Sequence, residues 1–148
     1  LEFHSVVNSK YPWLEHNLSG SHSLQNNFGV AKVHTYPVQV ISLNHFVEEH
    51  QITKIDLIKL DTECTEHMII DDSTDLINKF RPIIISEVYD YVKEDMNKAL
   101  NKLKDYSVYL LVNNQLHSMD SILSAKHAED EFDFVFCPNE KKAFIESI

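Results

Sequence analysis

Apolar residues along this chain recur with two different spacings, and the two kinds of segment alternate. Continuous apolar runs or strict alternation, both typical of strands, occur at residues 55–61, 82–88, 106–112 and 132–137. Helical spacing falls between these segments and is clearest over residues 96–103. Strands that alternate with helices indicate a parallel sheet covered by helices on both faces. The pattern therefore predicts an α/β domain with a mostly parallel sheet.

The remaining segments are shorter or less regular. We expect strands at residues 1–7 and 33–43, and helices at residues 43–50, 71–80 and 139–148. Pro37 places the second of these strands at an edge or a bend, since proline cannot donate to a central ladder. Pro82 forces the chain out of the helix before it. Residues 113–131 lean polar, and we predict no regular element there.

Length and charge limit the classes of function. A chain of 148 residues fits a single domain, residues 1–148, and 43% hydrophobic residues is ordinary for a folded protein. The formal charge of −10 and the single arginine, Arg81, argue against nucleic acid or an anionic membrane as partner. No apolar run approaches the roughly 18 residues of a membrane span. Cys64 and Cys137 are expected as free thiols, which favours a cytoplasmic protein.

Charged residues follow two of the predicted strands at the same end. Lys59 and Asp61 share a face of their strand because side chains alternate, and Glu87 ends the next strand. In open α/β sheets, ligands bind at the carboxyl ends of the strands. A lysine in a strand buried on both faces also costs several kcal/mol unless it is paired. We therefore expect these three residues to meet at one functional rim.

More acidic residues follow Asp61 directly. If residues 63–70 form a helix, Glu63 and Glu66 lie on one side of its first turn, with His67 beside them. A purely structural interpretation is available, because acids in a first turn favour the helix dipole and Thr62 could cap the helix. A pair formed by Lys59 with a neighbouring acid could likewise serve only to neutralise both charges.

The segments "ISLNHFVEEH", "IDLIKLDTECTEHMII" and "FRPIIISEV" resemble the FkbM-type methyltransferases, enzymes that use S-adenosylmethionine (SAM) and have a Rossmann-like sheet. The order and spacing of the family's motifs match over residues 40–88. "SGSHSL" and "FDFVFCP" are similar to flanking parts of the family pattern. Cys64 stands where the family has a glycine, and Asn44 replaces an aspartate. Because no glycine-rich loop is present, the resemblance implies the second half of the fold, with the SAM site largely outside this chain.

The resemblance implies methyl transfer from SAM to a hydroxyl group on a sugar or another small metabolite. Asp61 and Glu63 are then the expected base or acceptor clamp, directly or through a divalent metal ion, since clustered carboxylates suit hard cations. Lys59 would orient them and keep them ionised. The residues expected to contact the acceptor are Glu66, Glu87 and His67. No cofactor-binding or metal-binding residue is assigned.

Two other functions fit the same residues. Carboxylates at this rim could hold Mg²⁺ for phosphoester chemistry without SAM, although only Lys59 is placed to hold a phosphate. Alternatively, the chain is a non-catalytic α/β module that binds a partner, for example as a homo-oligomer. The sequence does not specify the methyl acceptor, the need for a metal or the oligomeric state.

Overall fold

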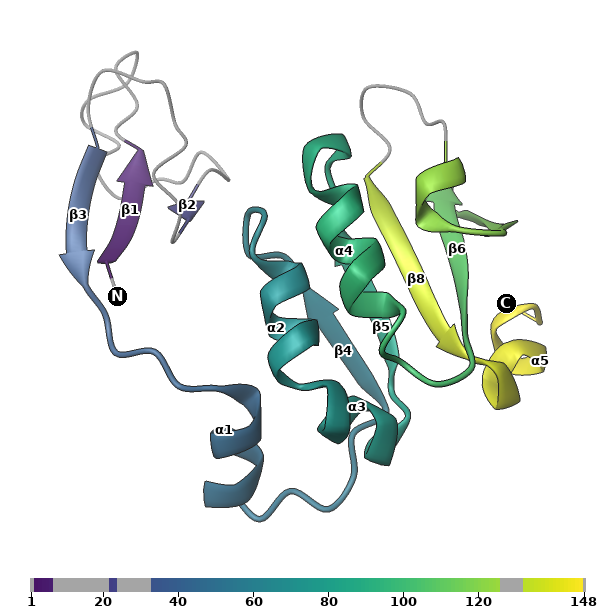
Figure 1. Ribbon diagram of the computed structural model, residues 1–148, viewed down its shortest axis with the longest axis horizontal. Coiled ribbons are helices and arrows are strands. Elements are labelled where there is room, and N and C mark those ends of the chain that lie inside the picture. The colour runs from purple at the N-terminus through teal and green to yellow at the C-terminus, as the bar shows by residue number, and fades with distance from the viewer. Residues whose placement is uncertain (1, 7–21, 24–32, 126–131, 148) are drawn as a thin grey trace.

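The computed structural model describes residues 2–6, 22–23, 33–125 and 132–147, which form two sheets (Figure 1). The smaller sheet has the order β2-β1-β3 and is antiparallel. Its strands are β1 (Glu2–Val6), β2 (His22–Ser23) and β3 (Val33–Pro37). The expected strands at 1–7 and 33–43 are thus present, but β3 ends at Pro37, where the chain leaves the ladder.

The larger sheet has five strands in the order β4-β5-β8-β6-β7. They are β4 (Leu57–Leu60), β5 (Ile83–Glu87), β6 (Tyr106–Val112), β7 (Gln115–Met119) and β8 (Asp133–Pro138). Only β4 and β5 pair in parallel, and the other three pairings are antiparallel. The prediction of an α/β fold is confirmed, but the prediction of a mostly parallel sheet is wrong.

The mixed sheet has two local causes. Asn113 and Asn114 both take left-handed φ values, 49° and 62°, and close a two-residue turn between β6 and β7. Such a turn permits only antiparallel pairing, so β7 occupies part of the segment for which no element was predicted. β8 then enters between β5 and β6 and runs antiparallel to both.

Three helices cover one face of the larger sheet (Figure 1). They are α2 (Glu66–Asp72), α3 (Thr74–Phe80) and α4 (Lys93–Leu100), and the remaining helices are α1 (Leu43–Glu49) and the short α5 (Lys142–Ile145). The core between helices and sheet includes the fully buried Ile70, Ile77, Ile84, Met96, Phe134 and Phe136. None of the helices in the described ranges is long and apolar enough to cross a bilayer.

The opposite face of this sheet is only partly covered. A smaller cluster there joins Val135 and Tyr109 to Ile145 of α5. β4 is the end strand of the described sheet, and its side chain Leu57 on this face is 55% exposed. The expectation that helices cover both faces is therefore wrong at β4, and Lys59 lies on the open side.

Arg81 links the end of α3 to the segment before β6 and to the segment after β8, at the end of the sheet where β5 begins. Its left-handed backbone (φ 55°) ends α3 just before Pro82. Its guanidinium binds both carboxylate oxygens of Glu140, each at 2.8 Å, and donates to the carbonyls of Lys104 and Asp105. The group also lies over the ring of Tyr106, 4.9 Å from its centre. This fork-to-fork ion pair lowers the pKa of Glu140 to about 2.

We predict that Glu140→Gln lowers the free energy of unfolding by about 1 kcal/mol at pH 7, because the side chain of Glu140 is half-exposed. The pKa of Glu140 is lower in the folded state than in the unfolded state. The contribution of ionised Glu140 to the free energy of unfolding is therefore complete above about pH 4.3 and is lost as the pH falls toward 2. Urea unfolding at several pH values measures the difference in the free energy of unfolding between the variant and the wild type.

The matched control is Asp56→Asn, which removes half of a fully surface-located pair with Lys54. It should change stability by a few tenths of a kcal/mol at most. A loss for Glu140→Gln that stays the same from pH 7 to pH 2 would contradict the assigned role of the ion pair.

Candidate functional site

Lys59 lies at the carboxyl end of β4, between two carboxylates. Its Nζ is 3.6 Å from Oδ2 of Asp61 and 3.6 Å from Oδ1 of Asp133, the first residue of β8. The Lys59 side chain is 47% exposed, so it is not the buried lysine that the apolar strand pattern predicted. β4 has no paired strand on its outer side among the described residues, and the Lys59 side chain extends the other way, past β5 toward Asp133 of β8. The structure does bring Lys59 and Asp61 together.

Glu87 and Asp133 form a pair of like charges across two strands. They occupy opposite positions in the antiparallel register of β5 and β8. Such pairs are destabilising, and the partly buried position adds to the cost. The pKa of Glu87 is raised, first by burial and then by the charges of Asp61, Asp133 and Glu66, although a hydrogen bond from Tyr89 Oη (3.0 Å) acts in the opposite direction.

The segment between β4 and α2 turns sharply instead of continuing into a helix. Glu63 and Cys64 both take left-handed φ values, 54° and 80°, and α2 begins only at Glu66. The expectation that Glu63 and Glu66 share a helical first turn is therefore wrong. Thr62 does not cap the helix either, since the N-cap position is Thr65. Cys64 adopts the conformation for which a glycine is best suited.

This turn places Glu63 among the other acids. The pKa of Glu63 is raised by burial and then by the charges of Glu87, Asp61 and Glu66. Asp61 and Glu63 belong to the turn after β4, Glu87 ends β5, and Glu66 begins α2. We call Lys59, Asp61, Glu63, Glu87 and Asp133 the acidic rim. Negative charge exceeds positive charge on this rim, so each added proton or bound cation relieves repulsion.

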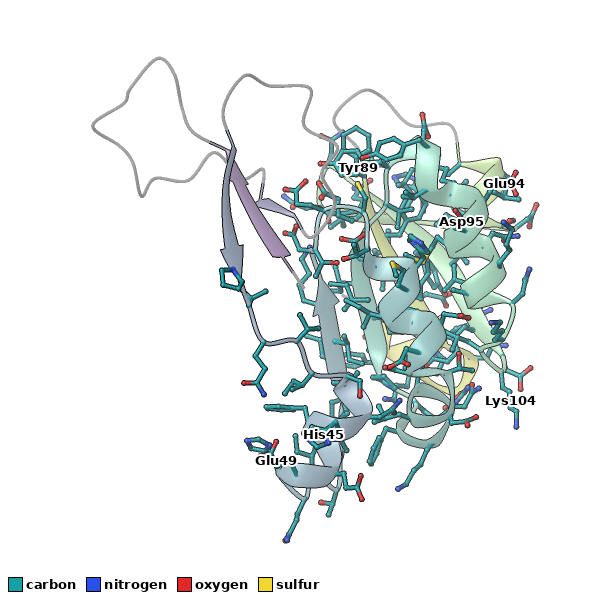
Figure 2. The ribbon with its side chains drawn as sticks, turned by 60° about the vertical axis from the view of Figure 1, so that its left-hand side comes forward. His45, Glu49, Tyr89, Glu94, Asp95 and Lys104 are labelled. Atoms are coloured by element: carbon teal, nitrogen blue, oxygen red, sulfur yellow. The ribbon has the colours of Figure 1, made fainter. Side chains whose placement is uncertain are left out.

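An aromatic group borders the acidic rim. The rings of Tyr89 and Tyr91 stack with 5.8 Å between centres, and Phe132 lies 4.7 Å from Tyr89. Tyr91 is 68% exposed, and its hydroxyl is 2.5 Å from the buried Sγ of Cys64. Figure 2 shows Tyr89 at the end of the sheet toward which β4 and β5 run, far from α1. Burial raises the pKa of Tyr89, so its phenol remains a donor at neutral pH.

A buried lysine holds the tyrosine segment in place. Lys93, the first residue of α4, is almost fully buried, and its Nζ donates to the carbonyl of Ala125 at 3.0 Å. The same ammonium pairs with Oδ1 of Asp90 at 2.7 Å. Because Asp90 lies between Tyr89 and Tyr91, this pair fixes the segment that carries both rings.

Two of the residues predicted to contact the acceptor lie elsewhere. Glu66 is buried beneath the acidic rim, with 1% of its surface exposed, and its carboxylate accepts hydrogen bonds from Thr62. His67 lies in a groove of about 470 Å³ whose lining also includes Asp71 of α2 and Asp95 of α4. α2 begins later than predicted, which turns His67 toward α4 and away from the rim.

Three residues of this site were missed from sequence. Asp133 was overlooked because its place depends on the antiparallel entry of β8, which the apolar pattern did not indicate. Tyr89 and Tyr91 follow Glu87 in the stretch "EVYDY", and that proximity was an available signal. Within the described ranges, no three His, Cys, Asp or Glu side chains are grouped to hold a metal ion. The divalent metal therefore stays a prediction.

Comparison with known protein families identifies a match over most of the chain. The model of the methyltransferase FkbM domain matches residues 1–134, which include every residue of the acidic rim. Neither a curated protein sequence nor a solved structure matches the chain.

We predict that Glu87→Gln stabilises the protein at pH 7, by up to about 1 kcal/mol, because it removes a like-charge pair. The amide oxygen can still accept the hydrogen bond from Tyr89. The pKa of Glu87 is higher in the folded state than in the unfolded state, so its ionisation destabilises the fold above that pKa. The gain should therefore be largest at neutral pH and vanish below about pH 4.3.

Thermal unfolding of the wild type and the variant between pH 4 and pH 8 measures this effect. Glu48→Gln, on the exposed surface of α1, is the matched control and should leave the melting temperature unchanged. A lower melting temperature for Glu87→Gln at pH 7 would mean that repulsion on the rim is not the dominant effect.

Proposed function

Because this chain belongs to the FkbM methyltransferase domain family, we propose that it carries the acceptor side of a SAM-dependent O-methyltransferase. The proposed acceptor is a hydroxyl group on a sugar or another small metabolite. The observation that carries the proposal is the acidic rim at the carboxyl ends of β4 and β5. This is the edge of an α/β sheet at which ligands bind.

Glu63 is the proposed general base. An alcohol must lose its proton as its oxygen attacks, and a base works best when its pKa lies near the working pH. Burial and the neighbouring carboxylates raise the pKa of Glu63 in that direction. The proton would pass from the acceptor hydroxyl to the carboxylate of Glu63.

Lys59, Asp61 and the Glu87–Tyr89 pair are proposed to orient the acceptor. Lys59 lies 3.6 Å from Asp61 and would hold the direction of this carboxylate, so that it can accept a hydrogen bond from a second hydroxyl of the acceptor. Tyr89 donates to Glu87 and fixes the direction of its carboxylate. Orientation of this kind can account for a large part of the rate enhancement in a group transfer.

The acidic rim suits one end of the cofactor. When bound, SAM supplies an electrophilic methyl group on a sulfonium cation. The carboxylates of the rim are suited to such a cation by charge. The chain has only two glycines, neither in a glycine-rich phosphate or dinucleotide loop, so no residues are assigned to the adenosine end.

We predict that Glu63→Gln lowers methyl transfer by about 10² to 10⁴-fold while the melting temperature stays at or above that of the wild type. Asp61→Asn should lower it less, because Asp61 is assigned to orientation. Turnover of the wild type should fall as acid protonates Glu63, at a pH above the ordinary glutamate value of about 4.3. That acid limb should be absent from the residual activity of Glu63→Gln.

The measurement is release of S-adenosylhomocysteine by protein whose binding of SAM has first been verified by calorimetry. It uses a panel of sugar and small-metabolite hydroxyl acceptors, with Glu48→Gln as the control. Wild-type turnover in both rim variants would exclude these carboxylates from the mechanism. Binding of both SAM and an acceptor without turnover in the wild type would favour the non-catalytic module.

A further inference from the structure

Two consecutive residues other than glycine hold left-handed backbone conformations in the turn between β4 and α2. They are Glu63 (φ 54°) and Cys64 (φ 80°). For residues with a side chain this region is unfavourable by about 1–2 kcal/mol each. The turn therefore persists only if contacts around it compensate for this strain.

The compensating contacts come from the buried carboxylate of Glu66. Its Oε1 accepts hydrogen bonds from the backbone N–H of Thr62 at 2.5 Å and from Thr62 Oγ1 at 3.0 Å. Thr65 Oγ1 lies 2.9 Å from Thr62 Oγ1 and 3.1 Å from the carbonyl of Thr62. Hydrogen bonds to an ionised acceptor are about twice as strong as neutral ones, and a buried carboxylate requires them.

The closed turn sets the positions of side chains on both of its sides. Its outer side carries Asp61 and Glu63 on the acidic rim. Its inner side directs Cys64 into the protein, with Sγ against the hydroxyl of Tyr91. If the turn opens, the placement of the two acids and the burial of Cys64 must change together, because residues 61–64 are contiguous.

We propose that Glu66 is a positioning residue, whose carboxylate locks the strained turn and so sets the placement of Asp61 and Glu63 for the acceptor. This inference rests on the proposed function for its catalytic part only. The sequence had suggested that Glu66 contacts the acceptor. Instead, it acts from below the rim, through the backbone and side chain of Thr62.

One cysteine of this chain can report opening of the turn, and the other serves as an internal control. It has two cysteines, Cys64 in the turn and Cys137 in β8, and both are buried thiols outside any disulfide. Opening of the turn exposes Cys64 alone, whereas general loosening of the protein exposes both. The rate of alkylation by iodoacetamide at each thiol, measured by peptide mass spectrometry, separates the two events.

In the intact chain, Glu66→Ala should increase the labelling rate of Cys64 at least about tenfold and leave that of Cys137 unchanged. Glu66→Gln should label like the wild type, because its amide oxygen can accept both hydrogen bonds from Thr62. Thr62→Val removes one of the two donors and should give an intermediate rate for Cys64. This milder variant keeps the test decisive if Glu66→Ala does not fold.

The control for a lost carboxylate is Glu94→Ala, at an exposed position in the first turn of α4. It should change neither labelling rate. Unchanged labelling of Cys64 in both Glu66→Ala and Thr62→Val would overturn the lock. Equal acceleration of Cys64 and Cys137 would overturn it too, since the effect would then be global.

The catalytic part has its own test. Glu66→Ala should lower kcat for methyl transfer, Glu66→Gln should restore it, and the loss should be smaller in a Cys64→Gly background, where the turn carries less strain. Normal kcat in Glu66→Ala together with faster labelling of Cys64 would overturn the link to catalysis. The labelling result does not depend on methyl transfer. The labelling experiment therefore still tests whether Glu66 holds the turn closed if the proposed function fails.

Discussion

The placement of one ammonium group between two carboxylates organises this site. Lys59 lies 3.6 Å from both Asp61 and Asp133, and these two acids come from segments more than seventy residues apart in the chain. Without that cation, the register that sets Glu87 opposite Asp133 would bring like charges together with little to offset them. The charge of Lys59 therefore supports both the pairing of β5 with β8 and the gathering of carboxylates on the acidic rim.

The stability needed to hold such a rim comes from the other face of the sheet. Ile84, Phe134 and Phe136 are fully buried against α2, α3 and α4. Strain and repulsion at functional sites persist where the surrounding packing overdetermines the backbone, and both are present here. The left-handed Glu63 and Cys64 lie directly beside the repelling carboxylates. One face of the sheet thus supplies the apolar packing that stabilises the fold, while the acidic rim lies at the carboxyl ends of β4 and β5.

Sequence reasoning located most elements and part of the site. β5 and β6 fall within one residue of their predicted bounds because continuous β-branched and aromatic runs leave little choice. The direction of β8 could not be read from its pattern, since alternation is the same in parallel and antiparallel strands. Asp133 was missed for that reason, while Lys59, Asp61 and Glu87 were placed correctly at one edge. The left-handed turn at Glu63 could not be read from the residues themselves, because Cys64 gives no glycine signal, although the resembling family has a glycine at this position.

If the acidic rim is one electrostatically coupled group, carbon-13 NMR titration of its carboxylates will detect that coupling. Glu63 and Glu87 should titrate above the ordinary glutamate value of about 4.3, and Asp133→Asn should lower the pKa of Glu87. Independent titration of Glu63 and Glu87 at the ordinary value, unchanged by Asp133→Asn, would contradict that coupling.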